Sequence, residues 1–159
     1  MKKLIYTLLI IIALTNNSFS AGTDSTDSSS NYTKSKNLIK AAKKYEKKGK
    51  IEKAQKKYAK AQTLLIKSNE KKPLQADTLN YLGFTTRKLG DYEKGEKFYL
   101  LGLQIDPNHN GINEYLGELY VATNRLDMAK ERLEVLKTCN CEEFEELREI
   151  IEGTKKSKY

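Results

Sequence analysis

Three short segments of the chain repeat one motif: GKIEKA at residues 49–54, GDYEKG at 90–95 and NRLDMA at 124–129. The second and third copies begin 34 residues apart, whereas the first and second begin 41 residues apart. Self-similarity at a period of this size is typical of proteins that stack one supersecondary unit repeatedly. The longer first spacing predicts seven inserted residues in the first unit.

Each copy lies at the turn of a predicted helical hairpin. Apolar or small side chains recur before and after it at i, i+3, i+4 and i+7, the spacing of one face of an amphipathic helix. Each copy begins with a residue type that accepts a positive φ beyond the end of a helix, namely Gly49, Gly90 and Asn124. The sixth residue of each copy is small, which lets the second helix approach the first, and these residues are Ala54, Gly95 and Ala129.

The hairpins resemble the tetratricopeptide repeat over residues 35–143. The second copy carries most of that pattern in Leu79, Leu82-Gly83, Gly90, Gly95, Tyr99, Gly102 and Asp106-Pro107-Asn108. The third copy matches it with Leu116-Gly117, Tyr120, Ala129, Leu133 and Leu136. The first copy matches it with Leu38, Ala41, Ala42, Tyr45, Gly49, Ala54, Tyr58 and Ala61. The chain departs from the pattern at Thr86, Gly95, Gly102, Asn113 and Cys141.

The resemblance implies an all-α fold, in which three tetratricopeptide-like hairpins form a right-handed α-solenoid that ends in a capping helix. The three repeats would span residues 35–75, 76–109 and 110–143. The seven inserted residues fall within 62–75, where they would either lengthen a helix or form a loop.

The capping helix is predicted over residues 142–153. Asn140 and Glu143 have the spacing of a capping box, which predicts the start of this helix. Phe144, Leu147 and Ile151 form one apolar stripe along it. Because the last hairpin of a repeat stack needs a cover for its apolar face, we expect this stripe to serve packing.

The resemblance also implies a concave binding groove, lined by the first helix of each hairpin. Its candidate partner-binding residues are Lys43, Lys47, Asn80, Phe84, Arg87, Lys88, Glu114 and Glu118. Phe84 and Arg87 are expected to be exposed there and to dominate binding, because these residue types are common in interface hot spots. The alternative places Phe84 in the core. Ile39 and Lys43 replace the Lys and Asn by which some family members hold a peptide carboxylate, so capture of a terminal carboxylate is not expected.

The two ends of the chain are predicted to lie outside the repeats. Residues 1–20 have the charged, apolar and small-residue regions of a secretory signal peptide, with cleavage favoured after Ser20 over Ala21. The alternative is a retained anchor, although the apolar run is too short to span a bilayer. Residues 21–34 are predicted to form a disordered leader and 154–159 a basic tail. We expect export, with the bacterial periplasm as the destination.

The chain carries a formal net charge of +8 that is spread unevenly. Residues 34–75 hold 15 lysines and three acidic residues, whereas residues 76–159 hold 12 basic and 16 acidic residues. The lysines either form a solvated surface or attract an acidic partner or an anionic envelope surface. Nucleic acid is not expected as a partner, because the basic segment is rich in lysine rather than arginine and lacks an aromatic platform.

Cys139 and Cys141 are the two cysteines of the chain. In an exported protein such a pair favours a disulfide, and the alternatives are free or intermolecular thiols and a redox or metal role. The run Cys139-Asn140-Cys141-Glu142-Glu143-Phe144-Glu145 resembles small exported bacterial tetratricopeptide proteins, which carry two cysteines before Glu-Glu-aromatic-Glu.

The sequence shows no catalytic constellation. It contains no Gly-rich phosphate loop, no G-x-S-x-G and no H-E-x-x-H, and its single histidine, His109, lies in a predicted surface turn. We therefore expect a non-enzymatic module that binds a protein, as a peptide or a helix, without a cofactor or metal. The alternatives are a thiol redox or metal-handling protein acting through Cys139 and Cys141, and a basic protein that adheres to surfaces.

Overall fold

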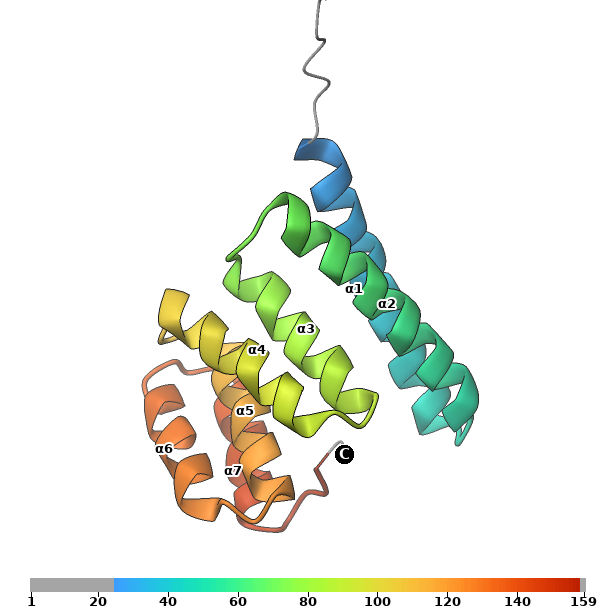
Figure 1. Ribbon diagram of the computed structural model, residues 1–159. Coiled ribbons are helices and arrows are strands. Elements are labelled where there is room, and N and C mark those ends of the chain that lie inside the picture. The colour runs from blue at the N-terminus through green and yellow to red at the C-terminus, as the bar shows by residue number, and fades with distance from the viewer. Residues whose placement is uncertain (1–24, 158–159) are drawn as a thin grey trace, which may run out of the picture.

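The computed structural model describes residues 25–157, which form seven helices and no β-strand. Figure 1 shows these helices, which are α1 (Ser25–Lys47), α2 (Ile51–Lys71), α3 (Ala76–Lys88), α4 (Tyr92–Ile105), α5 (Asn110–Ala122), α6 (Leu126–Leu136) and α7 (Glu142–Ile151). The predicted signal peptide lies outside the described residues.

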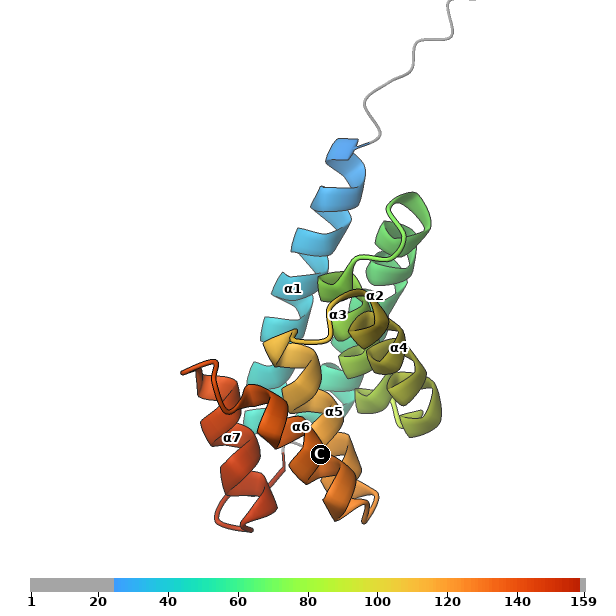
Figure 2. The same cartoon turned by 90° about the vertical axis from the view of Figure 1, so that its left-hand side faces the viewer.

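Consecutive helices pack as three hairpins, α1 with α2, α3 with α4 and α5 with α6 (Figure 1). The hairpins stack through contacts of α2 with α3 and of α4 with α5. The first helices, α1, α3 and α5, are neighbours on one side of the stack, and α7 closes the stack against α5 and α6 (Figure 2). The predicted all-helical repeat solenoid with a capping helix is confirmed.

The three hairpins turn in the same way. Gly49, Gly90 and Asn124 have φ values of 68°, 98° and 59°, as their residue types predicted. At the last of these turns the Arg125 amide donates to the Tyr120 carbonyl over 2.8 Å, and the Asn124 amide donates to the Val121 carbonyl over 3.1 Å. The same two hydrogen bonds recur at the other turns and form a Schellman motif, which satisfies the carbonyls at the end of each first helix.

The inserted residues lengthen a helix. Helix α2 has 21 residues against 14 in α4, so the difference accounts for all seven, and Leu65 and Ser68 in the added part of the hairpin are buried. The two helices of a hairpin are antiparallel, so the end of the second helix lies beside the beginning of the first. The added residues at the end of α2 therefore lie near the start of α1.

The predicted disorder of residues 21–34 is wrong from Ser25 onward, because α1 begins there. Asn31 and Ser35 are buried, and the Tyr32 ring lies 5.9 Å from the Tyr81 ring in an edge-to-face arrangement. Tyr81 of α3 therefore supplies a partner that the composition of the leader alone did not indicate.

Small residues allow neighbouring helices to pack closely. A Cβ atom on Gly83 would lie 2.5 Å from the Tyr99 ring, and one on Gly117 would lie 2.5 Å from the Leu147 side chain. Glycine at these positions of α3 and α5 thus makes room for a large side chain of the opposing helix. The Leu-Gly pairs of the sequence have this steric cause.

Helix α7 begins differently from the prediction. Its N-cap residue is Cys141, whose side chain accepts no capping hydrogen bond, and Asn140 has a φ of 49°. The expected capping box from Asn140 is therefore wrong, because an N-cap residue needs extended backbone. Leu147 and Ile150 are the buried residues of the helix, whereas Phe144 is half-buried. Among the helices that the structure describes, none is long and apolar enough to cross a membrane.

Candidate binding groove

Two adjacent hollows lie on the side of the stack formed by the first helices. The first has a volume of about 500 Å³ and lies between α1 and two tyrosines, Tyr81 and Tyr115. The second has a volume of about 470 Å³ and lies over α3, α5 and the start of α7. Because Tyr81 and Tyr115 line both hollows, the two are adjacent, and we call them together the groove.

One wall of the groove is basic. It consists of the lysines that line the first hollow, which are Lys36, Lys40, Lys43, Lys44 and Lys47. Lys43 is held in place, because its ammonium group donates to the Tyr115 hydroxyl over 3.3 Å and lies 4.6 Å from the centre of the Phe84 ring. We call these five residues the basic wall.

The opposite wall is acidic. It comprises Asp77, Asp106, Glu114, Glu142, Glu143 and Glu146, which line the second hollow or a smaller one of about 190 Å³ beside it. Carboxylate oxygens of Glu114, Glu118 and Glu146 lie within 4.8 Å of one another, which makes this group the one place among the described residues where three carboxylates could hold a cation. We call the six lining residues the acidic wall.

Phe84 and Arg87 are not exposed in the groove, so the prediction of their exposure is wrong. Phe84 is 2% exposed and packs between the rings of Tyr58 and Tyr115, whose centres lie 5.8 and 5.0 Å away. Arg87 is 1% exposed. Both side chains point from α3 into the junctions between hairpins. The periodicity of α3 could not distinguish this direction from the groove, since both neighbours of the helix offer apolar contacts.

Arg87 joins the second hairpin to the third. Its guanidinium donates to the Tyr115 carbonyl over 2.6 Å and lies 3.6 Å from the Glu118 carboxylate, with both side chains fully buried. Burial lowers the pKa of Arg87, and the nearby Tyr99 and Glu118 act against this shift. Arg87 and Glu118 thus form an ion pair inside the stack.

The structure brings some of the predicted residues to the groove and not others. Lys43 and Lys47 line the basic side, whereas Asn80 and Glu114 line the acidic side. Lys88 instead pairs with Glu46 over 2.5 Å, and Glu46 also accepts a hydrogen bond from the Tyr58 hydroxyl over 2.8 Å. Like the set of Phe84, Arg87 and Glu118, this network serves the contact between hairpins.

Sequence analysis missed the role of His109. Its Nδ1 accepts a hydrogen bond from the Ile112 amide over 3.2 Å, so His109 caps the start of α5. The proton of the neutral ring therefore sits on Nε2, which lies 3.2 Å from the Asp77 carboxylate. The sequence signal for this cap was a histidine three residues before an apolar residue at the predicted start of a helix. This signal is weak, because histidine is an uncommon N-cap residue.

Cys139 and Cys141 are joined by a disulfide, with their Cα atoms 5.2 Å apart. The bridge lies in the turn between α6 and α7, and both cysteines are half-buried. Sulfur atoms that are bonded to each other are not thiolates and do not ligate a metal in this state. The bridge instead shapes the turn that positions Glu142 and Glu143 of the acidic wall.

The stack of hairpins and its groove define a helical repeat protein. Residues 76–109 match the family model described as tetratricopeptide repeat. The chain is similar to the first such domain of Spaghetti (RPAP3) bound to the HSP90 peptide SRMEEVD, at 22% identity and a TM-score of 0.53, over 77% of this chain and 94% of that one. It is also similar to the first such domain of human RPAP3, at 22% identity and a TM-score of 0.55, over 79% and 98%. No curated protein matches the sequence significantly. The fold is therefore that of a tetratricopeptide-repeat domain.

Proposed function

We propose that the protein is a non-enzymatic interaction module that binds a peptide segment of a partner protein in the groove. The observation that carries this proposal is the groove itself, in which two adjacent hollows bring a lysine wall, two shared tyrosines and a carboxylate wall together. Tyrosine presents apolar surface together with a hydroxyl group and is common in binding sites. The volume of each hollow is in the range that accommodates several side chains of a ligand.

The structural neighbours support the same use of the fold. One of them, Spaghetti (RPAP3), was solved with a bound HSP90 peptide. In the present chain the predicted residues Phe84 and Arg87 are buried, which leaves the lysines and tyrosines as the accessible groups of the groove. The proposal therefore concerns peptide binding as such and not the HSP90 peptide.

Selection from a random peptide library tests this proposal. Asn37 is exposed on α1 and lines the first hollow, so Asn37→Trp places a bulky neutral side chain in the groove. Peptides selected on the wild-type protein should bind this variant at least about tenfold more weakly. Thr63→Trp is the matched control, because Thr63 is exposed on α2. Binding that is equally strong in all three proteins would contradict the proposal.

We also propose export to the bacterial periplasm. The charged start and apolar run of residues 1–20 support this location, and the Cys139–Cys141 disulfide is consistent with an oxidising compartment. Mass spectrometry of the protein purified from its own cells should find an N-terminus at Ala21. A protein that keeps Met1 or remains in the cytoplasm would contradict this location.

Thiol redox activity at Cys139 and Cys141 is a second candidate, favoured by the partial exposure of the bridge. A bridge with this role should open in a glutathione buffer at a potential near that of known exchange proteins, about −120 to −270 mV. Alkylation of the freed thiols after equilibration measures the potential. A bridge that opens only below about −300 mV would mark it as structural and would remove this candidate.

A further inference from the structure

The two walls of the groove impose an order on the charges of a ligand. Within the first hollow the charged lining residues are all lysines, and within the acidic hollows they are all Asp or Glu apart from His109. A ligand that fills the groove therefore meets one sign of charge on each side. Like charges that face each other across an interface reduce affinity, so the walls reject a ligand with the wrong arrangement.

Between the walls lies a fixed aromatic surface. The Tyr115 ring packs against Phe84 at 5.0 Å, and its hydroxyl accepts a hydrogen bond from Lys43. Burial raises the pKa of this hydroxyl, with Glu114 adding to the rise, so the group stays protonated at neutral pH. Tyr81 lies beside it and is braced by Tyr32 at 5.9 Å. Two rings held in this way can receive an aromatic or apolar side chain without losing much side-chain entropy of their own.

One residue of the acidic wall already forms an ion pair with a lysine of the same chain. Lys155, in the segment that follows α7, places its ammonium group 3.2 Å from Glu146 and 3.4 Å from Glu149. This pairing shows that a lysine side chain from outside the helices can approach the wall at ion-pair distance. Glu142 and Glu143, at the start of α7, extend the same wall toward the second hollow.

We propose, building on the proposed function, that the groove binds peptides whose charges are segregated along the chain. Carboxylates of the peptide lie on the basic wall, an aromatic or apolar side chain lies on Tyr81 and Tyr115, and Lys or Arg side chains lie on the acidic wall. The partner is thus a protein segment with acidic residues on one side of a central apolar residue and basic residues on the other. A wholly acidic peptide fits only half of the groove.

Two labelled peptides of equal composition test this inference. The peptide EEEGFGKKK segregates its charges, whereas EKEGFGKEK mixes them, and both have the same net charge and the same central phenylalanine. Fluorescence anisotropy at low salt should show about tenfold tighter binding of the segregated peptide. The difference should shrink at 1 M salt, where the Debye length falls to about 3 Å.

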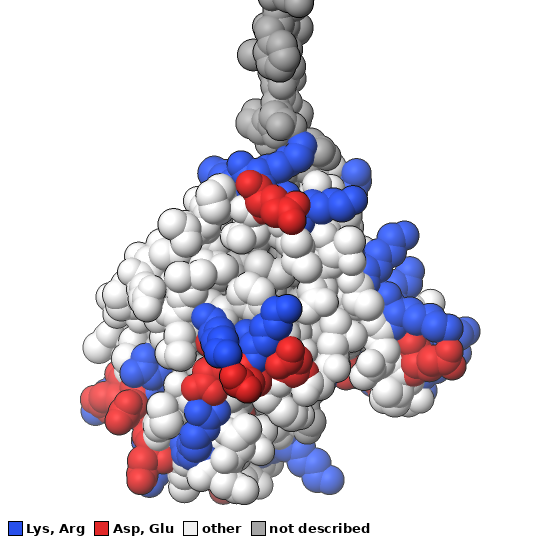
Figure 3. Space-filling model, in the orientation of Figure 1, with Lys and Arg blue, Asp and Glu red and all other residues white. Residues whose placement is uncertain are grey.

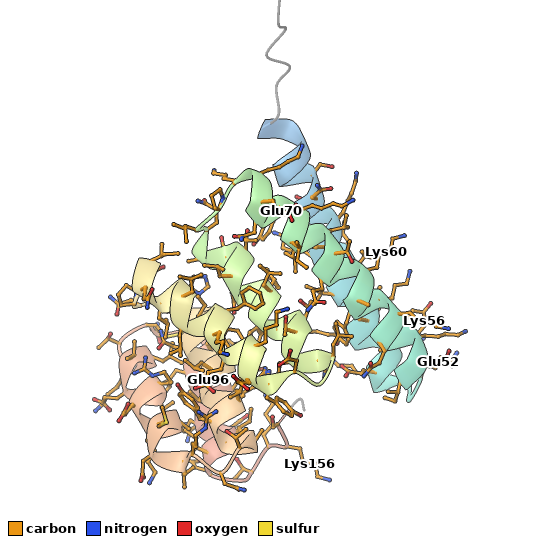
Figure 4. All side chains as sticks on the ribbon, viewed as in Figure 1. Glu52, Lys56, Lys60, Glu70, Glu96 and Lys156 are labelled. Atoms are coloured by element: carbon orange, nitrogen blue, oxygen red, sulfur yellow. A yellow bond between two sulfur atoms is a disulfide. The ribbon has the colours of Figure 1, made fainter. Side chains whose placement is uncertain are left out.

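Photo-crosslinking determines the orientation of the bound peptide in the groove. A benzophenone at the acidic end of EEEGFGKKK should react within residues 36–47 of α1, and one at the basic end should react with α5 or α7. Lys40→Glu/Lys44→Glu reverses two exposed charges of the basic wall and should weaken binding by tenfold or more. Lys53→Glu/Lys60→Glu makes the same change in net charge on exposed residues of α2 and should have little effect; Figure 4 labels Lys60 on the outer side of that helix.

The outcomes separate this inference from the proposed function. Equal binding of both peptides, or crosslinks from both ends to both walls, overturns the charge order, and so does failure of both peptides to bind. In each of these cases the proposed function stands if library peptides still lose affinity for the Asn37→Trp variant. If the wild-type chain dimerises and Asn37→Trp is monomeric in sedimentation velocity, a second copy occupies the groove and the inference is overturned.

Discussion

The first and third hairpins are built on the same turn but use charge in opposite ways. The third hairpin pairs its charges within the fold. Arg125 donates two hydrogen bonds to the Glu96 carboxylate, over 2.8 and 2.7 Å, and lies 4.5 Å from the centre of the Tyr120 ring. Glu118 pairs with Arg87 in the interior. Figure 4 labels Glu96 on α4 near this hairpin.

The first hairpin cannot pair its charges in this way, because 15 lysines face three acidic residues in residues 34–75. Figure 3 shows that basic side chains follow α2, whereas both signs mix over the lower part of the same face. On the groove side, four exposed lysines form most of the basic wall, namely Lys36, Lys40, Lys44 and Lys47. Charge that has partners thus stabilises the stack, and surplus charge remains available to solvent and to a ligand. Four predictions test this difference.

Arg87→Ala should have the largest effect. It leaves Glu118 buried next to an empty space, and removal of one partner of a buried ion pair costs about 3–5 kcal/mol of the free energy of unfolding. Urea denaturation measures the loss. The double variant Arg87→Met/Glu118→Leu should recover most of it, because both members of the ion pair are then replaced by apolar side chains. A loss below about 1 kcal/mol for Arg87→Ala would mean that this pair does not join the hairpins.

High pH should weaken the contacts between hairpins next. Burial raises the pKa of Tyr58, Tyr99 and Tyr115 above the usual value of about 10, so the unfolded chain loses these protons first. Their contribution is complete below pH 10 and is lost as the pH rises above it, by up to about 1.4 kcal/mol per pH unit for each tyrosine. Urea denaturation between pH 9 and 11.5 measures this slope.

The variant Tyr99→Phe is the control for the predicted loss of stability at high pH. Tyr99 is fully buried, and its hydroxyl has no hydrogen-bond partner among the described residues, so the change should cost little at pH 7. It should also make the loss of stability above pH 10 less steep than in the wild type. Tyr92→Phe, which changes an exposed tyrosine, is the comparison. An unchanged slope in Tyr99→Phe would argue against the prediction.

His109→Ala should have a smaller effect. It removes the cap of α5, which costs about 1 kcal/mol at a typical N-cap, and it also removes the contact with Asp77. His109→Asn should retain most of the stability, since asparagine is a favoured cap. Thermal or urea denaturation distinguishes the two variants. Equal stability of the alanine and asparagine variants would show that the cap contributes nothing measurable.

Lys56→Ala should have the smallest effect. Lys56 pairs with Glu52 over 2.6 Å on the exposed side of α2, where ion pairs at this spacing contribute about 0.3–0.5 kcal/mol. The difference from wild type should vanish at 1 M salt. A loss above 1 kcal/mol would show that the lysines of the first hairpin stabilise the fold, and the contrast between the hairpins would then be wrong.

The repeat period predicted most of the fold, because it depends on local chemistry. Gly49, Gly90 and Asn124 could be assigned to turns from their residue types alone, and the seven added residues could be assigned to the first unit from spacing. The start of α1 could not be predicted in this way. Asn31 and Ser35 are polar residues that the fold nevertheless buries, and Tyr32 between them packs against Tyr81, which lies 49 residues further along the chain.

The groove was predicted less well than the fold. The helices that line it were known from the resemblance, and Lys43 and Lys47 do line it, but Phe84 and Arg87 face the neighbouring hairpins. Helix α3 contacts α1, α2, α4 and α5, so its apolar face is too wide for the sequence to show which flank remains open. The acidic wall was not predicted as a unit, since it combines α3, α5, α7 and the turn before α5.

The length of the first hairpin also affects how the chain opens. Helix α1 has 23 residues and α3 has 13, so α1 continues beyond its neighbour for roughly 15 Å at 1.5 Å per residue. The main packing partner of α1 is α2, and Tyr32 near its start also contacts Tyr81 of α3. In a repeat stack each unit is protected by the units beside it, so amide hydrogens of the overhang should exchange with solvent sooner than those of α3 and α5. Fraying would then begin at one edge of the basic wall and travel toward the tyrosines.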